Sequence, residues 1–341
     1  MLADYYNYNI NDFVQLYSSL CSPPRATSQT FKSSLIRIEK IYESKLEKLN
    51  LKFINNPLEV ISLLKEQNYS ENTIYSTIST IGKIIRLVDA PLNIINKIRD
   101  ILSKLRNSNK EEEIKQQKTL KEKINWISYS QMISKCNEIL PEMLEFKNAY
   151  EFRAYMFLNL FLRQPPVRLG NYLNCLIMFN LTEEMINILP NINNYLLINK
   201  TQQAEQSDKQ TSEAVSSQQS SYTFIFNNYK TSKHYGQKRQ KITDETMIKI
   251  LDKYIFYFNR ESKNNKYFLD NGKSKSMSQT NASKLLLTIT EKLFKKSFSC
   301  DLLRHIYITE FLNENPQLKT KIEIASQMDH SFFQQNLYQK F

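Results

Sequence analysis

The chain has 341 residues, and its 46 lysines and arginines exceed its 34 aspartates and glutamates by 12 positive charges. This excess favours a polyanionic partner, with nucleic acid ahead of an anionic membrane surface. Because the sequence holds only four glycines, it contains neither GxGxxG nor GxxxxGK, which excludes the glycine-rich phosphate loops of most nucleotide-dependent enzymes.

The four cysteines, Cys21, Cys136, Cys175 and Cys300, are far apart in the sequence. No CxxC pair is present, so we expect neither a zinc site nor a disulfide framework, and a reducing compartment fits. The first residues lack the basic and apolar regions of a signal peptide, and no apolar stretch approaches the roughly 18 residues of a membrane helix. We therefore predict an intracellular protein with no metal, no cofactor and no membrane association.

The first third of the chain predicts a polar leader followed by a helical module. Residues 1–30 are rich in Tyr and Asn, and we expect them to be mostly disordered, with a helix over 10–20 as the alternative. Beyond them, apolar positions step by three and four, which predicts four short helices. We expect these helices to form one domain over residues 31–108.

The basic side chains of this module fall largely outside the apolar stripes of its helices. They include Lys83, Arg86, Lys97 and Arg99. A solvated surface accounts for them, and a face that binds DNA is the sharper prediction.

A densely charged segment follows the module. Residues 109–124 lack apolar periodicity, and we interpret them as a linker between two domains. Ser128 is expected to cap the next helix. Residues 147–163 are apolar nearly all round, which predicts a central buried helix.

A small sheet is predicted next. Residues 194–199 and 222–227 are rich in aromatic and β-branched side chains and predict strands, with a third strand near 237–242. The polar low-complexity tract 201–221 is expected to form a solvated loop. Five helices are then expected over 243–258, 279–295, 301–313, 317–327 and about 331–339. The predicted fold class is mainly α with a small antiparallel sheet (α+β), with a larger second domain over 125–341.

Five residues that suit anion chemistry lie near the ends of these elements. Arg168 begins a helix, where the positive helix N-terminus adds to the guanidinium charge. Lys230 lies at the tip of a hairpin, and Arg304 follows an apolar helix face. His330 lies at the exit of a helix, and Tyr338 follows about two turns later. Side chains placed in this way can converge on one anion.

The wording around these residues carries a resemblance. The order PPVRLGNY, YKTSKHYG, LLRHIYIT and ASQMDHS, followed by Tyr338, resembles the tyrosine recombinase (phage integrase-like) family. The first two segments look most like the recombinases of Crypton transposons and eukaryotic virus-like mobile elements. The resemblance implies a core-binding domain over 31–108 and a catalytic domain over 125–341.

The resemblance also implies a role for each residue. Tyr338 would attack a DNA phosphodiester and form a 3′-phosphotyrosyl link. Arg168 and Arg304 would stabilise the negative charge of the transition state, and His330 would hydrogen-bond to the phosphate. Lys230 would donate a proton to the leaving 5′-oxygen.

The chain departs from the family pattern at one position. The second family motif usually reads HxxR, and its first position is Asp301 here. Asp301 either caps its helix or acts as a base toward the tyrosine. His305 either compensates in part for the missing histidine or packs against its neighbours. Lys233 is the near alternative to Lys230.

Taken with the positive charge, the resemblance implies a site-specific recombinase or integrase. It would act on double-stranded DNA, as a homotetramer on synapsed sites, to integrate or excise a mobile element or a viral genome. A eukaryotic host would imply the nucleus, and no small-molecule substrate is expected. Two alternatives stay open, which are a catalytically inactive DNA-binding protein derived from a recombinase and a type IB topoisomerase-like enzyme.

Overall fold

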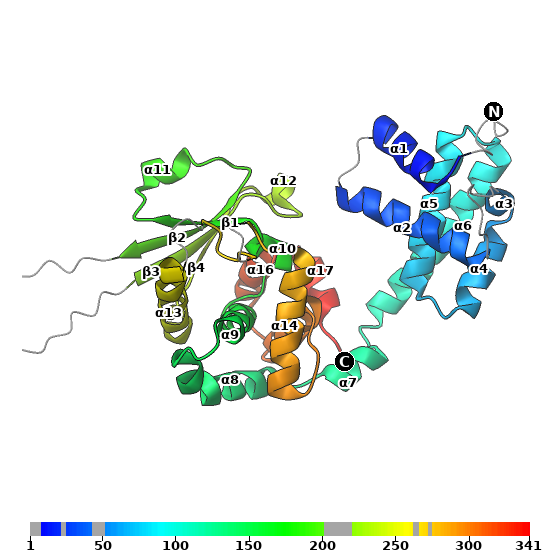
Figure 1. Ribbon diagram of the computed structural model, residues 1–341. Helices are drawn as coiled ribbons and strands as arrows, with labels where there is room; N and C mark the ends of the chain where they lie inside the picture. The colour runs from blue at the N-terminus through cyan, green and yellow to red at the C-terminus, as the bar shows by residue number, and fades with distance from the viewer. Residues whose placement is uncertain (1–7, 22–24, 43–51, 201–219, 262–265, 272–274) are drawn as a thin grey trace, which may run out of the picture. The chain divides into compact units, whose positions relative to one another are not determined.

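The computed structural model describes residues 8–21, 25–42, 52–200, 220–261, 266–271 and 275–341. The chain divides into two compact units, which are Met1–Lys115 (unit 1) and Gln116–Phe341 (unit 2). Each unit has its own hydrophobic core. Mainly helical composition with one small sheet confirms the predicted fold class (Figure 1).

Unit 1 is built from helices alone. They are α1 (Ile10–Cys21), α2 (Arg25–Ile41), α3 (Lys52–Asn55), α4 (Pro57–Glu66), α5 (Glu71–Leu87) and α6 (Leu92–Ile114). The side chain of Ser70 caps α5 by accepting a hydrogen bond from the Thr73 backbone. Gly82 lets α5 and α6 approach closely, because a Cβ there would lie 3.3 Å from Ile98 Cγ2.

The prediction of a disordered leader is wrong for the described part of residues 1–30, and the alternative of a helix over 10–20 is confirmed. Phe13 and Tyr17 lie four residues apart on one face of α1 and are buried. The Tyr17 ring stacks on that of Phe31, with 4.4 Å between centroids. The polar composition concealed this short apolar stripe, which is enough to attach α1 to the core. Residues 1–7 and 22–24 lie outside the described residues.

Phe13→Ala is expected to lower the free energy of unfolding of unit 1 by about 3–5 kcal/mol, because it empties a fully buried aromatic site. Leu20→Ala is the matched control, since Leu20 belongs to the same helix and is 64% exposed. Denaturant unfolding of the full chain, followed by circular dichroism, measures both changes. Equal midpoints for the two variants would show that α1 contributes nothing to the core.

The predicted linker over 109–124 is mostly helical. Helix α6 continues to Ile114, and α7 (Leu120–Asn125) begins with a capping box in which Thr119 and Glu122 each accept from the other's backbone. A helix that is polar all round can extend into solvent. The charged composition of this segment therefore did not show where the preceding helix ends. The division between the units falls between Lys115 and Gln116.

Unit 2 contains a four-stranded sheet in the order β1-β2-β3-β4. The strands are β1 (Cys175–Phe179), β2 (Asn194–Lys200), β3 (Ser220–Phe226) and β4 (Lys238–Lys241). The last three pair antiparallel, as predicted, but β1 pairs parallel with β2, so the sheet is mixed. The parallel crossover contains α11 (Glu183–Asn187), which lies on the face of the sheet opposite α9 and α13 (Figure 1). Of the predicted loop over 201–221, residues 220 and 221 belong to β3, and the rest lies outside the described residues.

Helix α9 (Ala149–Leu162) is the centre of unit 2 and confirms the predicted buried helix. Ten of its residues are buried, and it packs against α8 (Tyr129–Leu144), α13 (Glu245–Glu261), α14 (Gln279–Phe294) and α15 (Cys300–Asn313). Ser128 caps α8, as predicted. Edge-to-face ring contacts link Phe157 and Phe161 of α9 to Tyr172, and Tyr172 to Phe224 of β3. These rings fix the segment that carries Arg168 between the central helix and the sheet.

Four shorter elements complete unit 2. They are α10 (Leu169–Tyr172), α12 (Ser232–Tyr235), α16 (Leu318–Gln327) and α17 (Phe332–Tyr338). The last two match the predicted helices over 317–327 and 331–339 closely. Among the described residues, no helix combines the length and the apolar character needed to cross a membrane.

Candidate active site

Three of the predicted site residues meet in unit 2, and they come from α15, from α17 and from the connection between α16 and α17. Arg304 lies in the first half of α15, His330 lies in the connection between α16 and α17, and Tyr338 ends α17. Contacts of α17 with both α15 and α16 bring these positions together. The order of the motifs in the sequence thus corresponds to one cluster in space.

The guanidinium of Arg304 is the centre of this cluster. Arg304 is 0% exposed, and its Nη2 donates a hydrogen bond to the Met328 carbonyl oxygen at 3.0 Å and also contacts His330 Nε2. Its Nε and Nη1 are buried and make no hydrogen bond to any described residue. Burying donors of a charged group without acceptors is costly, so these two nitrogens favour an anionic ligand.

His330 adds a third unused donor. Burial and, after it, the positive charge of Arg304 lower the pKa of His330 to about 2, so its ring is neutral at physiological pH. Because a guanidinium only donates, His330 Nε2 accepts from Arg304, and the ring hydrogen therefore lies on Nδ1. Nδ1 is buried and lacks a hydrogen-bond partner in the described part of the chain.

Tyr338 packs between two histidine rings. Its ring centroid lies 4.2 Å from that of His330 and 4.6 Å from that of His305, and 5.5 Å from the guanidinium carbon of Arg304. His305 Nδ1 donates to the Tyr338 backbone oxygen at 2.8 Å. Burial lowers the pKa of His305 and so favours its neutral ring. His305 therefore holds the backbone of Tyr338, which agrees with the packing interpretation.

The residues that follow Tyr338 are fastened within unit 2. The Lys340 backbone donates to Thr309 Oγ1 at 3.0 Å. The Phe341 backbone donates to the Gln116 carbonyl at 2.9 Å and accepts from the Lys118 backbone. These bonds fix the chain directly after the carboxyl end of α17.

Asp301 does not cap its helix. The N-cap of α15 is Ser299, whose side chain accepts from the Leu302 backbone, and Asp301 lies exposed in the first turn. The capping prediction is therefore wrong, because the serine two residues earlier already occupies that position. Among the described residues, no hydrogen bond joins Asp301 to Tyr338.

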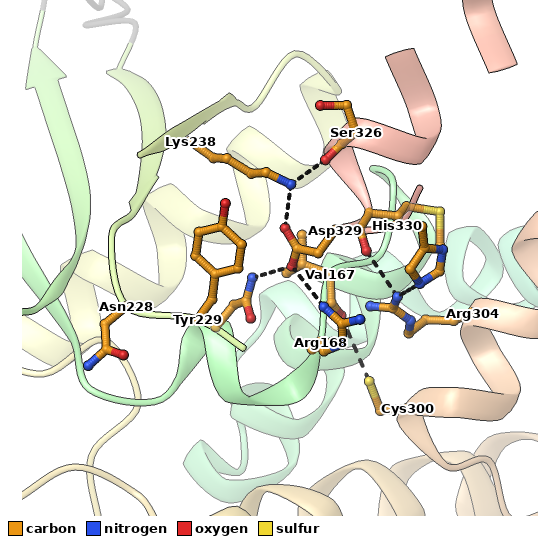
Figure 2. A network of polar contacts seen from close by, with 12 residues as sticks. Val167, Arg168, Asn228, Tyr229, Lys238, Cys300, Arg304, Ser326, Asp329 and His330 are labelled. Atoms are coloured by element: carbon orange, nitrogen blue, oxygen red, sulfur yellow. Dashed lines mark hydrogen bonds and ion pairs between the residues drawn. The ribbon is translucent and has the colours of Figure 1, made fainter. Parts of the chain in front are cut away.

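Arg168 joins the cluster through a carboxylate that the sequence did not single out. It precedes α10, and its Nη1 lies 3.9 Å from Asp329 Oδ2 (Figure 2). Helix α10 has only four residues, so the expected contribution of a helix dipole is small and the guanidinium itself is the main positive charge. Arg168 Nη1 is buried and makes no hydrogen bond within the described ranges.

The lysine that reaches the cluster is Lys238. Its Nζ contacts Asp329 Oδ1 at 2.6 Å and donates to the Ser326 carbonyl (Figure 2). It also lies over the rings of Tyr229 and Tyr235. Lys238 begins β4, directly across from Phe226 of β3. Sequence reasoning missed Lys238, because 46 basic residues make every lysine near a hairpin equally plausible.

Lys230 and Lys233 lie in the connection between β3 and β4 and are exposed. Neither forms a hydrogen bond or ion pair with another described residue. The connection itself is well held, since the Asn227 and Asn228 backbones donate to Asn194 Oδ1 at 2.9 and 2.8 Å. The structure thus brings Lys238, and not the two predicted lysines, to Arg168 and Asp329.

In unit 1, three of the four predicted DNA-binding residues share a groove. Lys83 and Arg86 of α5 and Arg99 of α6 line it, together with residues that include Gly82 and Ile98. Lys97 is exposed and is not part of this lining. No group of three or more His, Cys, Asp or Glu side chains suited to a metal ion occurs in the described part of the chain.

Comparisons with known proteins give only distant likenesses. No protein-family model matches the sequence, and none of the curated proteins matches it. Among solved structures, the chain is similar to a protein described as XerA recombinase, with 12% sequence identity and a TM-score of 0.39. That alignment covers 98% of this chain and 94% of the other. At such values the likeness carries no weight for activity.

Proposed function

We propose that the protein breaks and rejoins DNA strands through a covalent link between DNA and Tyr338. The tyrosine hydroxyl releases its proton to water, and its oxygen forms a bond to phosphorus while the bond from phosphorus to the 5′-oxygen breaks. The departing 5′-oxygen takes up a proton, and a 5′-hydroxyl later reverses the step and restores the strand. The observation that supports this proposal best is a fully buried arginine, Arg304, with two unused donors beside the Tyr338 ring.

The unused donors fit the charge of this reaction. The attack places additional negative charge on the non-bridging phosphate oxygens. Arg304 Nε and Nη1, Arg168 Nη1 and His330 Nδ1 are donors that make no hydrogen bond within the described residues. Donors fixed in advance in a site that excludes water stabilise such developing charge strongly.

The proton for the leaving oxygen requires a separate donor. We propose Lys238 for this role, because its ammonium group lies with Arg168 around Asp329. Lys230 and Lys233 are the alternatives on the same hairpin.

DNA binding is proposed to involve unit 1. Lys83, Arg86 and Arg99 line one groove, and Lys97 is exposed on α6, so these residues are available to phosphate groups. The resemblance of the sequence to recombinases of mobile elements and eukaryotic virus-like elements supports a tetramer on synapsed DNA, with integration or excision as the outcome. In a eukaryotic host, the protein would act in the nucleus.

An inactive DNA-binding protein is the second candidate. Asp301 places a carboxylate one helical turn before Arg304, and an ionised carboxylate there repels a phosphate. This candidate predicts binding that weakens with salt and no covalent product.

Covalent trapping tests the proposal. Duplexes that bind the protein are selected from a random pool, nicked, and incubated in EDTA with the wild type, with Tyr338→Phe and with Tyr150→Phe. Tyr150 is a suitable control because it is 53% exposed on α9. We expect a denaturant-resistant adduct with the wild type and Tyr150→Phe only.

The other results separate the alternatives. An adduct with Tyr338→Phe would assign the nucleophile to another tyrosine. Binding without any adduct would favour the inactive protein. Supercoil relaxation by a monomer, without exchange between two sites, would favour a topoisomerase-like enzyme.

A further inference from the structure

A buried carboxylate lies at the point where the cations of the site converge. Asp329 is 1% exposed and lies between α16 and α17. Its Oδ1 contacts Lys238 Nζ at 2.6 Å, and its Oδ2 accepts from Asn171 Nδ2 at 2.8 Å and lies 3.9 Å from Arg168 Nη1 (Figure 2). Both carboxylate oxygens therefore contact donors that could also bind a phosphate.

The positive charge nearby exceeds what Asp329 neutralises. Arg168 and Lys238 both form ion pairs with Asp329, and Arg304 is bonded to the carbonyl of the preceding residue, Met328. His330 follows directly and is neutral, because burial and the nearby cations lower its pKa. The site thus holds three cations around one carboxylate, and donors on Arg168, Arg304 and His330 stay unused among the described residues.

We propose that Asp329 is a resident anion of this site, which neutralises Lys238 and Arg168 when no ligand is bound and competes with a phosphate group for them. The inference rests on the proposed function, since it takes a phosphodiester as the ligand of the site. Buried cations without a counter-charge are costly, so Asp329 stabilises the unoccupied site. A phosphate group that enters must take over its partners, and Asp329 therefore weakens binding of simple anions. It acts on the ligand through Lys238 and Arg168 and is a positioning residue.

The backbone at Asp329 allows a clean substitution. Its φ is 61°, in the left-handed region that asparagine adopts more readily than most residues and that glycine adopts freely. Asp329→Asn keeps the shape and removes the charge, and Asp329→Gly is a second variant without the side chain. Glu138→Gln is the matched control, because its side chain is 66% exposed in unit 2 and pairs with Lys135 of α8.

Calorimetric titration with inorganic phosphate, at constant ionic strength, tests the proposal on the full chain. We expect Asp329→Asn to bind phosphate at least tenfold more tightly than the wild type and Glu138→Gln to bind within twofold. The Asp329 charge lies within about 4 Å of the cations that would bind the phosphate. At the dielectric of a partly exposed site, removing a charge at that distance changes the affinity for phosphate by at least a factor of about ten. Adding Lys238→Gln to Asp329→Asn is expected to remove most of the gain.

A second titration uses dimethyl phosphate, which has the single charge and two ester oxygens of a nucleic-acid phosphate. A gain with both probes supports competition for a phosphodiester. A gain with inorganic phosphate alone would overturn the diester part of the inference and assign the site to a free phosphate.

Unchanged or weaker phosphate binding in both Asp329 variants would overturn the proposal. Variants that stay unfolded with and without phosphate would overturn it too, because the carboxylate would then be a structural requirement that no anion replaces. Variants that recover their fold in phosphate support it. The adduct assay on the wild type is independent of these results, so a tighter anion site without an adduct would refute only the tyrosine chemistry.

Discussion

Arg304→Gln is expected to slow formation of the Tyr338–DNA adduct by about 10³-fold or more, while DNA binding changes by less than about threefold. Arg304 is fully buried, and two of its donors have no acceptor among the described residues. These donors gain their full interaction only when charge develops on the phosphate, so their loss affects the reaction more than the binding step. Single-turnover cleavage of a nicked duplex measures the rate, and a binding isotherm measures the affinity.

Two further substitutions of Arg304, to lysine and to methionine, show what kind of role its side chain has. Arg304→Lys keeps the charge but loses the planar fork, so we expect an intermediate loss of about 10²-fold. Arg239→Gln is the control for loss of one positive charge, because Arg239 is a surface residue paired with Glu183. If Arg304 were purely structural, Arg304→Met would lower the free energy of unfolding by several kcal/mol. Because its buried charge has unused donors, we expect Arg304→Met to be no less stable than the wild type.

Lys238→Ala is expected to slow cleavage by about 10²–10⁴-fold, because it removes the proposed proton donor for the leaving 5′-oxygen. A substrate with sulfur in place of that oxygen needs no proton to leave, so it is expected to restore most of the rate to Lys238→Ala and none to Arg304→Gln. The same single-turnover assay measures both substrates.

The matched controls for Lys238 are the two exposed lysines on the same hairpin. Lys230→Ala and Lys233→Ala are expected to cleave within about threefold of the wild type, because neither side chain forms a hydrogen bond or ion pair with a described residue. If Lys230→Ala proves slow and sulfur restores it, the hairpin changes shape on DNA and Lys230 is the proton donor.

Local signals in the sequence were sufficient for most helices. Ser128 caps its helix as predicted, and the nearly continuous apolar character of 147–163 identified the central helix. Strand β1 was missed because Cys175–Phe179 is a five-residue apolar run, which periodicity cannot assign to a strand or a helix. Its parallel pairing with β2 depends on a crossover that no local pattern encodes.

Site residues could be predicted where the order of motifs along the chain identifies them. They could not be predicted where only their proximity in the folded structure does. Arg304, His330 and Tyr338 lie within 35 residues of one another and meet as expected. Lys238 reaches Asp329 only because β4 is the last strand of the sheet and approaches the end of α16. An aspartate is ordinarily exposed, so nothing in the sequence marked Asp329 as buried; only its partners explain that burial.

The position of the site along the chain fixes when it can form during synthesis. In unit 1, all helix contacts lie within the first 115 residues of the chain, between sequence neighbours such as α5 and α6 and between more distant helices such as α2 and α5. Units of this kind fold early, and the amino-terminal one precedes the rest as the chain emerges. In unit 2, α15 packs against α8 and α9, which precede it by more than a hundred residues. A nascent chain interrupted before residue 300 therefore carries the groove between α5 and α6 but lacks Arg304, His330 and Tyr338, so the proposed DNA cleavage requires nearly all of unit 2 to have been translated.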